Sequence, residues 1–152
     1  GLRSGTENTL GIYSLNHAIN FWMNNINDNI QHMARLQKAF LKEISQLEGV
    51  VLNSPMGGAP HILNLSFIGV GGEILLHSLE ADGICVSTGS ACSSRKKDPR
   101  ISNALGFDKA RAESQLRISF THDTNEEEVI FAAKRIAAIC REHRILMRRK
   151  RK

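Results

Sequence analysis

The sequence predicts one α/β domain with two layers, built from a long N-terminal helix, about four strands and a C-terminal helix. Three patterns support this: a long amphipathic segment near the N-terminus, about four short strand segments in the middle, and an amphipathic C-terminal segment. The 152 residues, 41% of them hydrophobic, suffice for one core of ordinary size but not for two. We therefore expect a single core.

The first pattern is a stripe of apolar residues at three- and four-residue intervals, as on one face of an α-helix. We expect this helix to begin near Thr6, because Ser4 and Glu7 have the spacing of a capping box, and to end at Gly49. The Asn-rich segment 24–29 favours a bend. The stripe predicts a core or dimer contact and consists of Leu15, Ile19, Trp22, Ile26, Ile30, Met33, Leu36, Phe40, Ile44 and Leu47.

Four short apolar segments then predict strands, at residues 50–52, 61–67, 84–87 and 116–120. In the second, Leu63, Leu65 and Phe67 alternate with Ile62, Asn64 and Ser66, which is the period of a half-buried strand. A glycine-rich turn and a helix at Glu73–Ala81 precede the third, and short helices precede the fourth. Cys85 lies midway along the third strand, so we expect it in the core.

The C-terminal segment predicts a helix that Thr124 and Glu127 begin with a second capping box. Acidic residues 126–128 suit its positive end and the Lys/Arg-rich residues suit its negative end. The residues expected to face the core are Val129, Ala133, Ile136, Cys140 and Leu146.

The positive charge is concentrated at the C-terminus. The formal net charge is +5, and residues 141–152 contribute +6, which leaves −1 for the other 140 residues. A basic tail, residues 148–152, differs from the basic face of a nucleic-acid-binding domain, and no aromatic stacking positions accompany it. We expect at most weak contact with nucleic acid through this tail.

Membrane insertion and secretion are not expected, because no apolar run approaches the roughly 18 residues of a membrane helix and no signal peptide is evident. The odd number of cysteines, three, favours a reduced cytoplasmic setting over a disulfide framework. They form no Cys-x-x-Cys pair and the histidines are scattered, so no metal site is expected.

Cys92 lies in a loop of small and polar residues, Thr88–Pro99, that has nothing to bury its sulfur. The neighbouring cations Arg95, Lys96 and Lys97 favour the thiolate form. An accessible thiolate on a glycine-containing loop suits a nucleophile that must move to its substrate. Exposed thiols also occur without a function, so the composition of the loop leaves both interpretations open.

The order of residues in this loop adds to the argument. Val86-Ser87-Thr88-Gly89-Ser90-Ala91-Cys92-Ser93-Ser94 resembles the active-site loop of the cysteine desulfurases, pyridoxal phosphate enzymes that take sulfur from L-cysteine and hold it as a persulfide. The resemblance continues, in the same order and spacing, through Arg3–Thr6, Ala59–Phe67 and Leu116–Phe120. Residues 101–106 resemble the corresponding helix of the family only loosely.

The resemblance implies the small C-terminal domain of the aminotransferase-like fold, PLP fold type I, over residues 1–147, with residues 1–8 ending a loop of the large domain. It implies that Cys92 is the nucleophile and that Arg117 binds the substrate α-carboxylate, a task suited to the donor fork of a guanidinium. Thr6 matches a threonine that reaches the cofactor phosphate in the neighbouring subunit of a homodimer.

The family's cofactor lysine follows a histidine, and this sequence contains no His-Lys pair. We therefore expect the chain to be a C-terminal portion that does not desulfurate cysteine by itself. The resemblance implies L-cysteine as the substrate of the whole enzyme, and a sulfur acceptor such as an iron–sulfur scaffold as its partner. Two alternatives remain open: a carrier module that receives a persulfide on Cys92 from another protein, and an interaction domain that binds through its basic tail.

Overall fold

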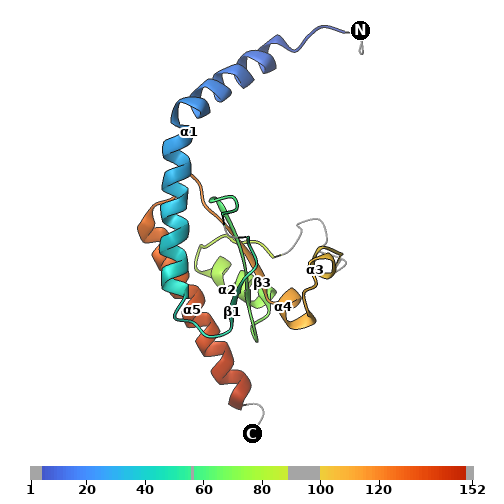
Figure 1. Ribbon diagram of the computed structural model, residues 1–152, viewed down its shortest axis with the longest axis vertical. Coiled ribbons are helices and arrows are strands. Elements are labelled where there is room, and N and C mark those ends of the chain that lie inside the picture. The colour runs from blue at the N-terminus through green and yellow to red at the C-terminus, as the bar shows by residue number, and fades with distance from the viewer. Residues whose placement is uncertain (1–4, 56, 89–99, 150–152) are drawn as a thin grey trace.

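The computed structural model describes residues 5–55, 57–88 and 100–149 and has a mixed α/β architecture (Figure 1). Helices α1 and α5 lie on one side of a small sheet, and the short helices α3 and α4 lie on the other (Figure 1). In chain order, the elements are α1 (Thr9–Ile44), β1 (Val50–Leu52), β2 (Ile62–Phe67), α2 (Gly72–Ala81), α3 (Arg100–Ala104), α4 (Lys109–Glu113), β3 (Gln115–Ser119) and α5 (Glu126–Arg149).

The sheet has three strands in the order β1-β2-β3, and both pairs are antiparallel. Asn64 of β2 lies opposite Arg117 of β3, and Ser66 lies opposite Val51 of β1. The register therefore determines which residues of the three strands share a face.

The expectation of a complete strand at residues 84–87 was wrong. The amide of Ile84 still donates to the carbonyl of Leu79 at the end of α2 (2.9 Å), so the start of this segment is tied to the helix. Only Ser87 pairs with β3, as an isolated bridge to Arg117. The segment supplies one rung of the sheet rather than a strand.

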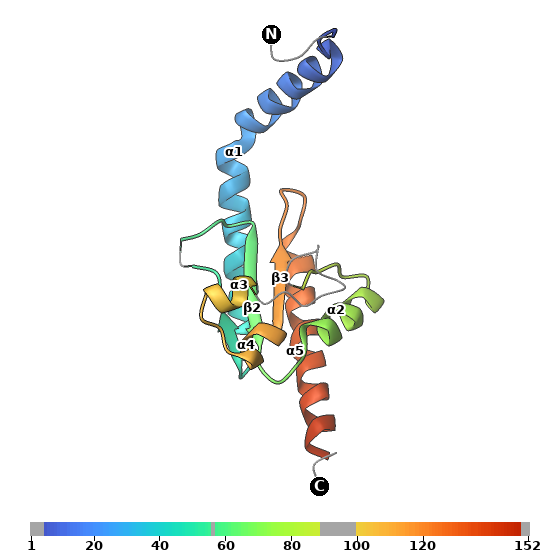
Figure 2. The same cartoon turned by 90° about the vertical axis from the view of Figure 1, so that its right-hand side faces the viewer.

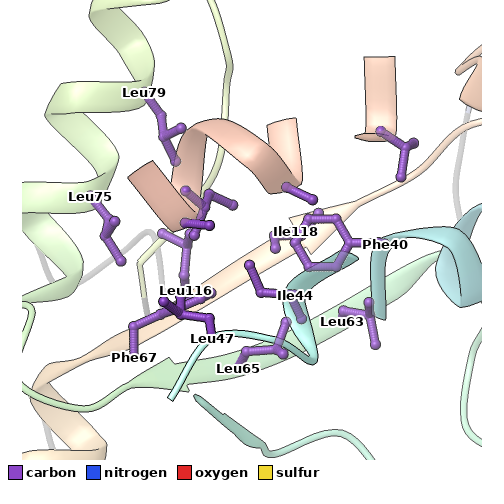
Figure 3. Close-up of a cluster of buried hydrophobic side chains, with 14 of the residues drawn as sticks. Phe40, Ile44, Leu47, Leu63, Leu65, Phe67, Leu75, Leu79, Leu116 and Ile118 are labelled. Atoms are coloured by element: carbon purple, nitrogen blue, oxygen red, sulfur yellow. The ribbon is translucent and has the colours of Figure 1, made fainter. Parts of the chain in front are cut away.

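The core lies on the inner face of the sheet, between the strands and helices α1, α2 and α5 (Figure 3). Leu63, Leu65 and Phe67 of β2 point inward, as their alternation predicts, and Leu116 and Ile118 of β3 join them. The helices contribute the other labelled residues of Figure 3, namely Phe40 and Ile44 from α1 and Leu75 and Leu79 from α2, together with Leu47 just beyond α1.

Helix α1 starts three residues later than expected. Its N-cap is Asn8, whose Oδ1 accepts a hydrogen bond from the amide of Gly11 (2.9 Å), and Ser4 of the predicted capping box lies outside the described residues. The helix ends at Ile44, and the chain turns at Gly49 with a φ of 69°.

The apolar stripe of α1 divides into two parts. The C-terminal part enters the core through Met33, Leu36, Phe40 and Ile44. The N-terminal part is exposed: Leu15 retains 60% of its accessible surface and Trp22 retains 42%. Figures 1 and 2 show this part bent relative to the rest of α1 and projecting beyond the sheet.

Helix α5 begins with a capping box one residue later than the predicted one. The amide of Glu128 donates to Oδ1 of Asn125 (2.8 Å), and the amide of Asn125 donates to Oε2 of Glu128 (3.0 Å). Thr124 instead accepts a hydrogen bond from the amide of Thr121 in the preceding turn (3.0 Å).

The core face of α5 is confirmed for four of its five predicted residues: Val129, Ala133, Ile136 and Cys140 are buried. Leu146 is exposed, contrary to expectation, because the last turns of α5 extend past the sheet (Figure 2). Helix α5 continues to Arg149, two residues into the predicted tail, and residues 150–152 lie outside the described ones. Among the described helices, none combines the length and apolar character required to span a bilayer.

We expect Phe40→Ala to destabilise the chain by about 3–5 kcal/mol, because Phe40 has no accessible surface and its ring lies 6.2 Å from that of Phe120, centroid to centroid. Urea unfolding followed by circular dichroism measures the change. The matched control is Phe131→Ala on the exposed side of α5, expected to change stability by less than about 0.5 kcal/mol. Equal losses in the two variants would contradict this placement of the core.

Candidate functional site

Arg117 lies on the outer face of β3, the face turned away from the core. Its neighbours Leu116 and Ile118 point into the core, so strand alternation directs Arg117 outward. Nη2 of its exposed guanidinium donates to Oγ of Ser87 (3.3 Å). Among the described residues, no other one accepts a hydrogen bond from this guanidinium, so its remaining donors can meet an anion that approaches this face.

The segment that leads toward Cys92 is fixed beside Arg117. The amide of Ser87 donates to the carbonyl of Arg117 (3.1 Å), and the amide of Arg117 donates to the carbonyl of Ser87 (2.7 Å). The next residue, Thr88, donates from Oγ1 to Oε1 of Glu73 on α2 (3.0 Å). The chain therefore leaves the sheet between β3 and the start of α2.

The start of α2 packs directly against β3. A Cβ atom built at Gly72 would lie 2.4 Å from the carbonyl oxygen of Gln115 and 3.2 Å from Cγ2 of Thr88. Only glycine allows this approach, so Gly72 brings Glu73 within reach of Thr88.

Cys92, together with Arg95, Lys96 and Lys97, lies outside the described residues. Thr88, four residues earlier in the sequence, is the last described residue before it.

Thr6 is exposed and lies two residues before the N-cap of α1. This end of α1 projects far from the sheet that carries Arg117 (Figure 1). The structure therefore does not bring Thr6 and Arg117 of one chain together. A hydroxyl beside the positive end of a long helix suits an anionic group such as a phosphate.

Cys85 is exposed, so the prediction that it is a core residue was wrong. Ile84 and Val86 pack against the core, which directs the residue between them outward. Cys140 is buried as expected, and burial raises the pKa of its thiol to about 11 against the opposing effect of Arg144 and Arg141. A thiol held protonated in this way is unsuited to nucleophilic attack.

A group of polar side chains beside Arg117 was missed by the sequence analysis. Asn53, Asn64, Ser66 and Arg111 form a continuous chain of hydrogen bonds on the outer face of the sheet. Ser66 has no accessible surface, yet its hydroxyl is satisfied by this group. The sequence contained one indication of this polar group: two positions of the segment 61–67 that face away from the core hold the polar residues Asn64 and Ser66.

The chain matches a known protein family. The model of the family described as aminotransferase class-V matches residues 1–130. The chain belongs to the class-V aminotransferase family. Enzymes of this family use pyridoxal 5′-phosphate, so the class of cofactor implied by the loop motif is confirmed.

Curated members of the family resemble the chain over most of its length. It is 34% identical over 149 residues to cysteine desulfurase IscS of Clostridium botulinum, covering 95% of this chain and 38% of that protein. It is 40% identical over 138 residues to the enzyme of the same name from Pseudomonas putida, covering 90% of this chain and 34% of that protein. The chain thus spans well under half the length of these class-V relatives.

Solved structures support the same assignment. A NifS-like protein superposes with a TM-score of 0.76 at 29% identity, covering 91% of this chain and 35% of that one. A NifS-like protein from Rickettsia africae superposes with a TM-score of 0.73 at 25% identity, over 90% and 36% of the respective chains. The predicted aminotransferase-like fold of this class-V chain is confirmed.

We expect the two described cysteines to differ strongly in reactivity. At pH 8, a thiol with a pKa near 11 is about one part in a thousand thiolate, so native Cys140 should resist iodoacetamide. The exposed Cys85 should be alkylated first. Peptide mass spectrometry after timed labelling measures both sites, with a urea-unfolded sample as control. Rapid native labelling of Cys140 would contradict its burial.

Proposed function

We propose that this chain is the part of a cysteine desulfurase that carries the nucleophile, Cys92, and the carboxylate-binding residue, Arg117. The observation that carries the proposal is the pairing of Arg117 with Ser87, which joins an outward-facing cation to the segment leading to Cys92. The similarity to curated proteins named cysteine desulfurase supports it.

Arg117 binds the α-carboxylate of L-cysteine through the donor fork of its guanidinium. Two parallel N–H donors match the two oxygens of a carboxylate. The hydrogen bond from Nη2 to Ser87 occupies one edge of the guanidinium and limits its rotation. The substrate is thereby held on the outer face of the sheet.

Cys92 accepts the sulfur. Cys92 lies four positions after Thr88 in the sequence, so covalent geometry keeps their Cα atoms within roughly 14 Å of one another. In the proposed step, the thiolate of Cys92 forms an S–S bond to the substrate sulfur as the C–S bond breaks. Protonation of the carbon then gives L-alanine and leaves a persulfide on Cys92.

Pyridoxal phosphate, when bound, supplies the electron sink for bond cleavage at the substrate. Of the described residues, Thr6 fits a contact to its phosphate, because its hydroxyl lies next to the positive end of α1. The start of α1 lies far from the sheet (Figure 1), which favours a homodimer in which Thr6 serves the partner subunit.

The chain alone is proposed to be inactive. Its sequence has no His-Lys pair, so the lysine that binds the cofactor is expected in a different part of the enzyme. The persulfide sulfur then passes, as the resemblance implies, to an acceptor such as an iron–sulfur scaffold or to a thiolation pathway in the cytoplasm.

The protein expressed from the complete reading frame should release sulfide from L-cysteine with pyridoxal phosphate and a reductant. Cys92→Ser should reduce the rate at least about a thousandfold, because a hydroxyl cannot accept the sulfur. The 152-residue chain should release none. Methylene blue detection of sulfide measures all three proteins.

The matched control is Cys85→Ser, which removes an exposed thiol from the same segment of the chain and should leave the rate within about twofold. Full activity of Cys92→Ser would overturn the assignment. Cofactor binding without any sulfide release by the complete protein would favour the carrier module instead.

Arg117→Ala should raise the KM for L-cysteine about a hundredfold, because loss of a charge-assisted bidentate contact costs about 3 kcal/mol. Arg117→Lys should recover part of this loss, since an ammonium keeps the charge but not the fork. Steady-state kinetics measures both. Arg141→Ala, which removes an exposed arginine from α5, is the control and should leave the KM unchanged. An unchanged KM in Arg117→Ala would show that another residue binds the carboxylate.

A further inference from the structure

We infer that the side-chain amide of Asn64 donates a second hydrogen bond to the carboxylate that Arg117 binds. The inference rests on the proposed function of Arg117 and adds a residue to that site. It follows from the direction of the hydrogen bonds in the polar group on the outer face of the sheet and from the strand register.

The direction of these hydrogen bonds is fixed by Arg111, because a guanidinium can only donate. Nε of Arg111 lies 2.7 Å from the side chain of Asn53, so the atom it contacts must be the acceptor, Oδ1. Arg111 is itself held in place, since its guanidinium carbon lies 3.9 Å from the centroid of the Phe107 ring.

The orientation of Asn53 then determines that of Asn64. With Oδ1 toward Arg111, Nδ2 of Asn53 donates to Oδ1 of Asn64 (2.7 Å) and to Oγ of Ser66 (2.8 Å). Ser66 in turn donates to the carbonyl of Arg111 (2.8 Å). Reversing the amide of Asn64 would place two donors against each other, so Asn64 must direct its Nδ2 hydrogens away from Asn53.

Nδ2 of Asn64 therefore remains a donor for a ligand. Within the described ranges, no acceptor bonds to this nitrogen, and it is not among their buried unsatisfied atoms. Asn64 is only partly buried, so this nitrogen can be reached from the outer face of the sheet.

The register places this donor beside Arg117. Asn64 and Arg117 are opposite one another, and the backbone of Arg117 bonds to Ser87 rather than to Asn64. Such a non-hydrogen-bonded pair has the closer spacing of an antiparallel ladder, with Cα atoms about 4.5 Å apart and side chains in reach of one another. One carboxylate can therefore meet both donors.

The two donors have different parts in recognition. Arg117 supplies the charge, while Asn64 adds a neutral donor at a fixed position that the Arg111–Asn53 pair maintains. Asn64 therefore selects the orientation of the carboxylate, and a substrate with a neutral amide in its place would lose the contact to Arg117 as well as part of that to Asn64.

Asn64→Asp tests this directly in the protein from the complete reading frame. The variant keeps an acceptor for Asn53 but replaces the donor with an anion that pairs with Arg117. We expect the KM for L-cysteine and the inhibition constant of L-alanine to rise about a hundredfold, and that of L-alaninamide, which lacks the carboxylate, to change less than about twofold. Asn103→Asp, an exposed site on α3, is the charge-matched control and should change none of them.

Three outcomes decide the matter. An equal rise for L-alanine and L-alaninamide would mean that Asn64 has a structural role only, which overturns the inference. An unchanged constant for L-alanine in Asn64→Asp, with a raised one in Arg117→Ala, would overturn the inference and leave the proposed function intact. If the inhibition constant of L-alanine changed in neither variant, both the inference about Asn64 and the proposed function of Arg117 would be overturned.

A measurement on the wild-type protein does not depend on whether a variant folds correctly. In ¹⁵N-edited spectra of the wild-type protein, L-alanine should shift the side-chain N–H signals of both Asn64 and Arg117, and L-alaninamide should shift both signals less. A shift of the Arg117 signal alone would show that the guanidinium binds the carboxylate without Asn64, and the inference would fail.

Discussion

The antiparallel pairing of β2 with β3 determines which side chains of these strands enter the core and which reach the ligand face. Leu65 opposite Leu116 and Leu63 opposite Ile118 close the core, so the residues between them, Asn64 and Arg117, are forced outward together. A slip of one residue would exchange the two faces. The burial of apolar side chains in the core thus also fixes the positions of the polar side chains of the site.

A very short helix supports this arrangement from the outer side. Helix α4 has five residues, too few to be stable without tertiary contacts. Its amide at Arg111 is capped by Oδ1 of Asp108 (2.7 Å), and its arginine side chain bonds to Asn53 in the loop after β1. The helix and the orientation of the Asn53 amide therefore depend on each other.

Helices and strands with long periodic patterns could be predicted from the sequence. Features that depend on which of several neighbouring residues takes a role could not. The core residues of β2 and α5 followed from alternation and helical spacing. The caps at Asn8 and Asn125 were missed because Ser, Thr and Asn are near-equivalent as N-caps, and neighbouring candidates were present for each helix. The exposure of Cys85 was missed because a single apolar segment does not reveal which of its residues face inward.

The candidate site was predictable in part. Arg117 could be selected through the family motif, but the hydrogen-bonded group beside it joins residues 53, 64, 66 and 111. These residues are widely separated in sequence, and folding brings them together from one strand, a loop and a helix. No periodic pattern of a helix or a strand in the sequence brings these four positions together. The direction of each amide in the group required knowledge of the arginine that contacts it.

Helix α1 links two distant parts of the molecule without a break in its helical structure. Its 36 residues measure about 54 Å along the bent helix axis (Figure 1), with the core at one end and the exposed N-cap at the other. Each residue of an α-helix adds a rise of about 1.5 Å and a rotation of about 100°. An exposed position of α1 can therefore change its side chain at little cost, whereas the insertion or deletion of one residue would turn everything before it to a different side of the molecule.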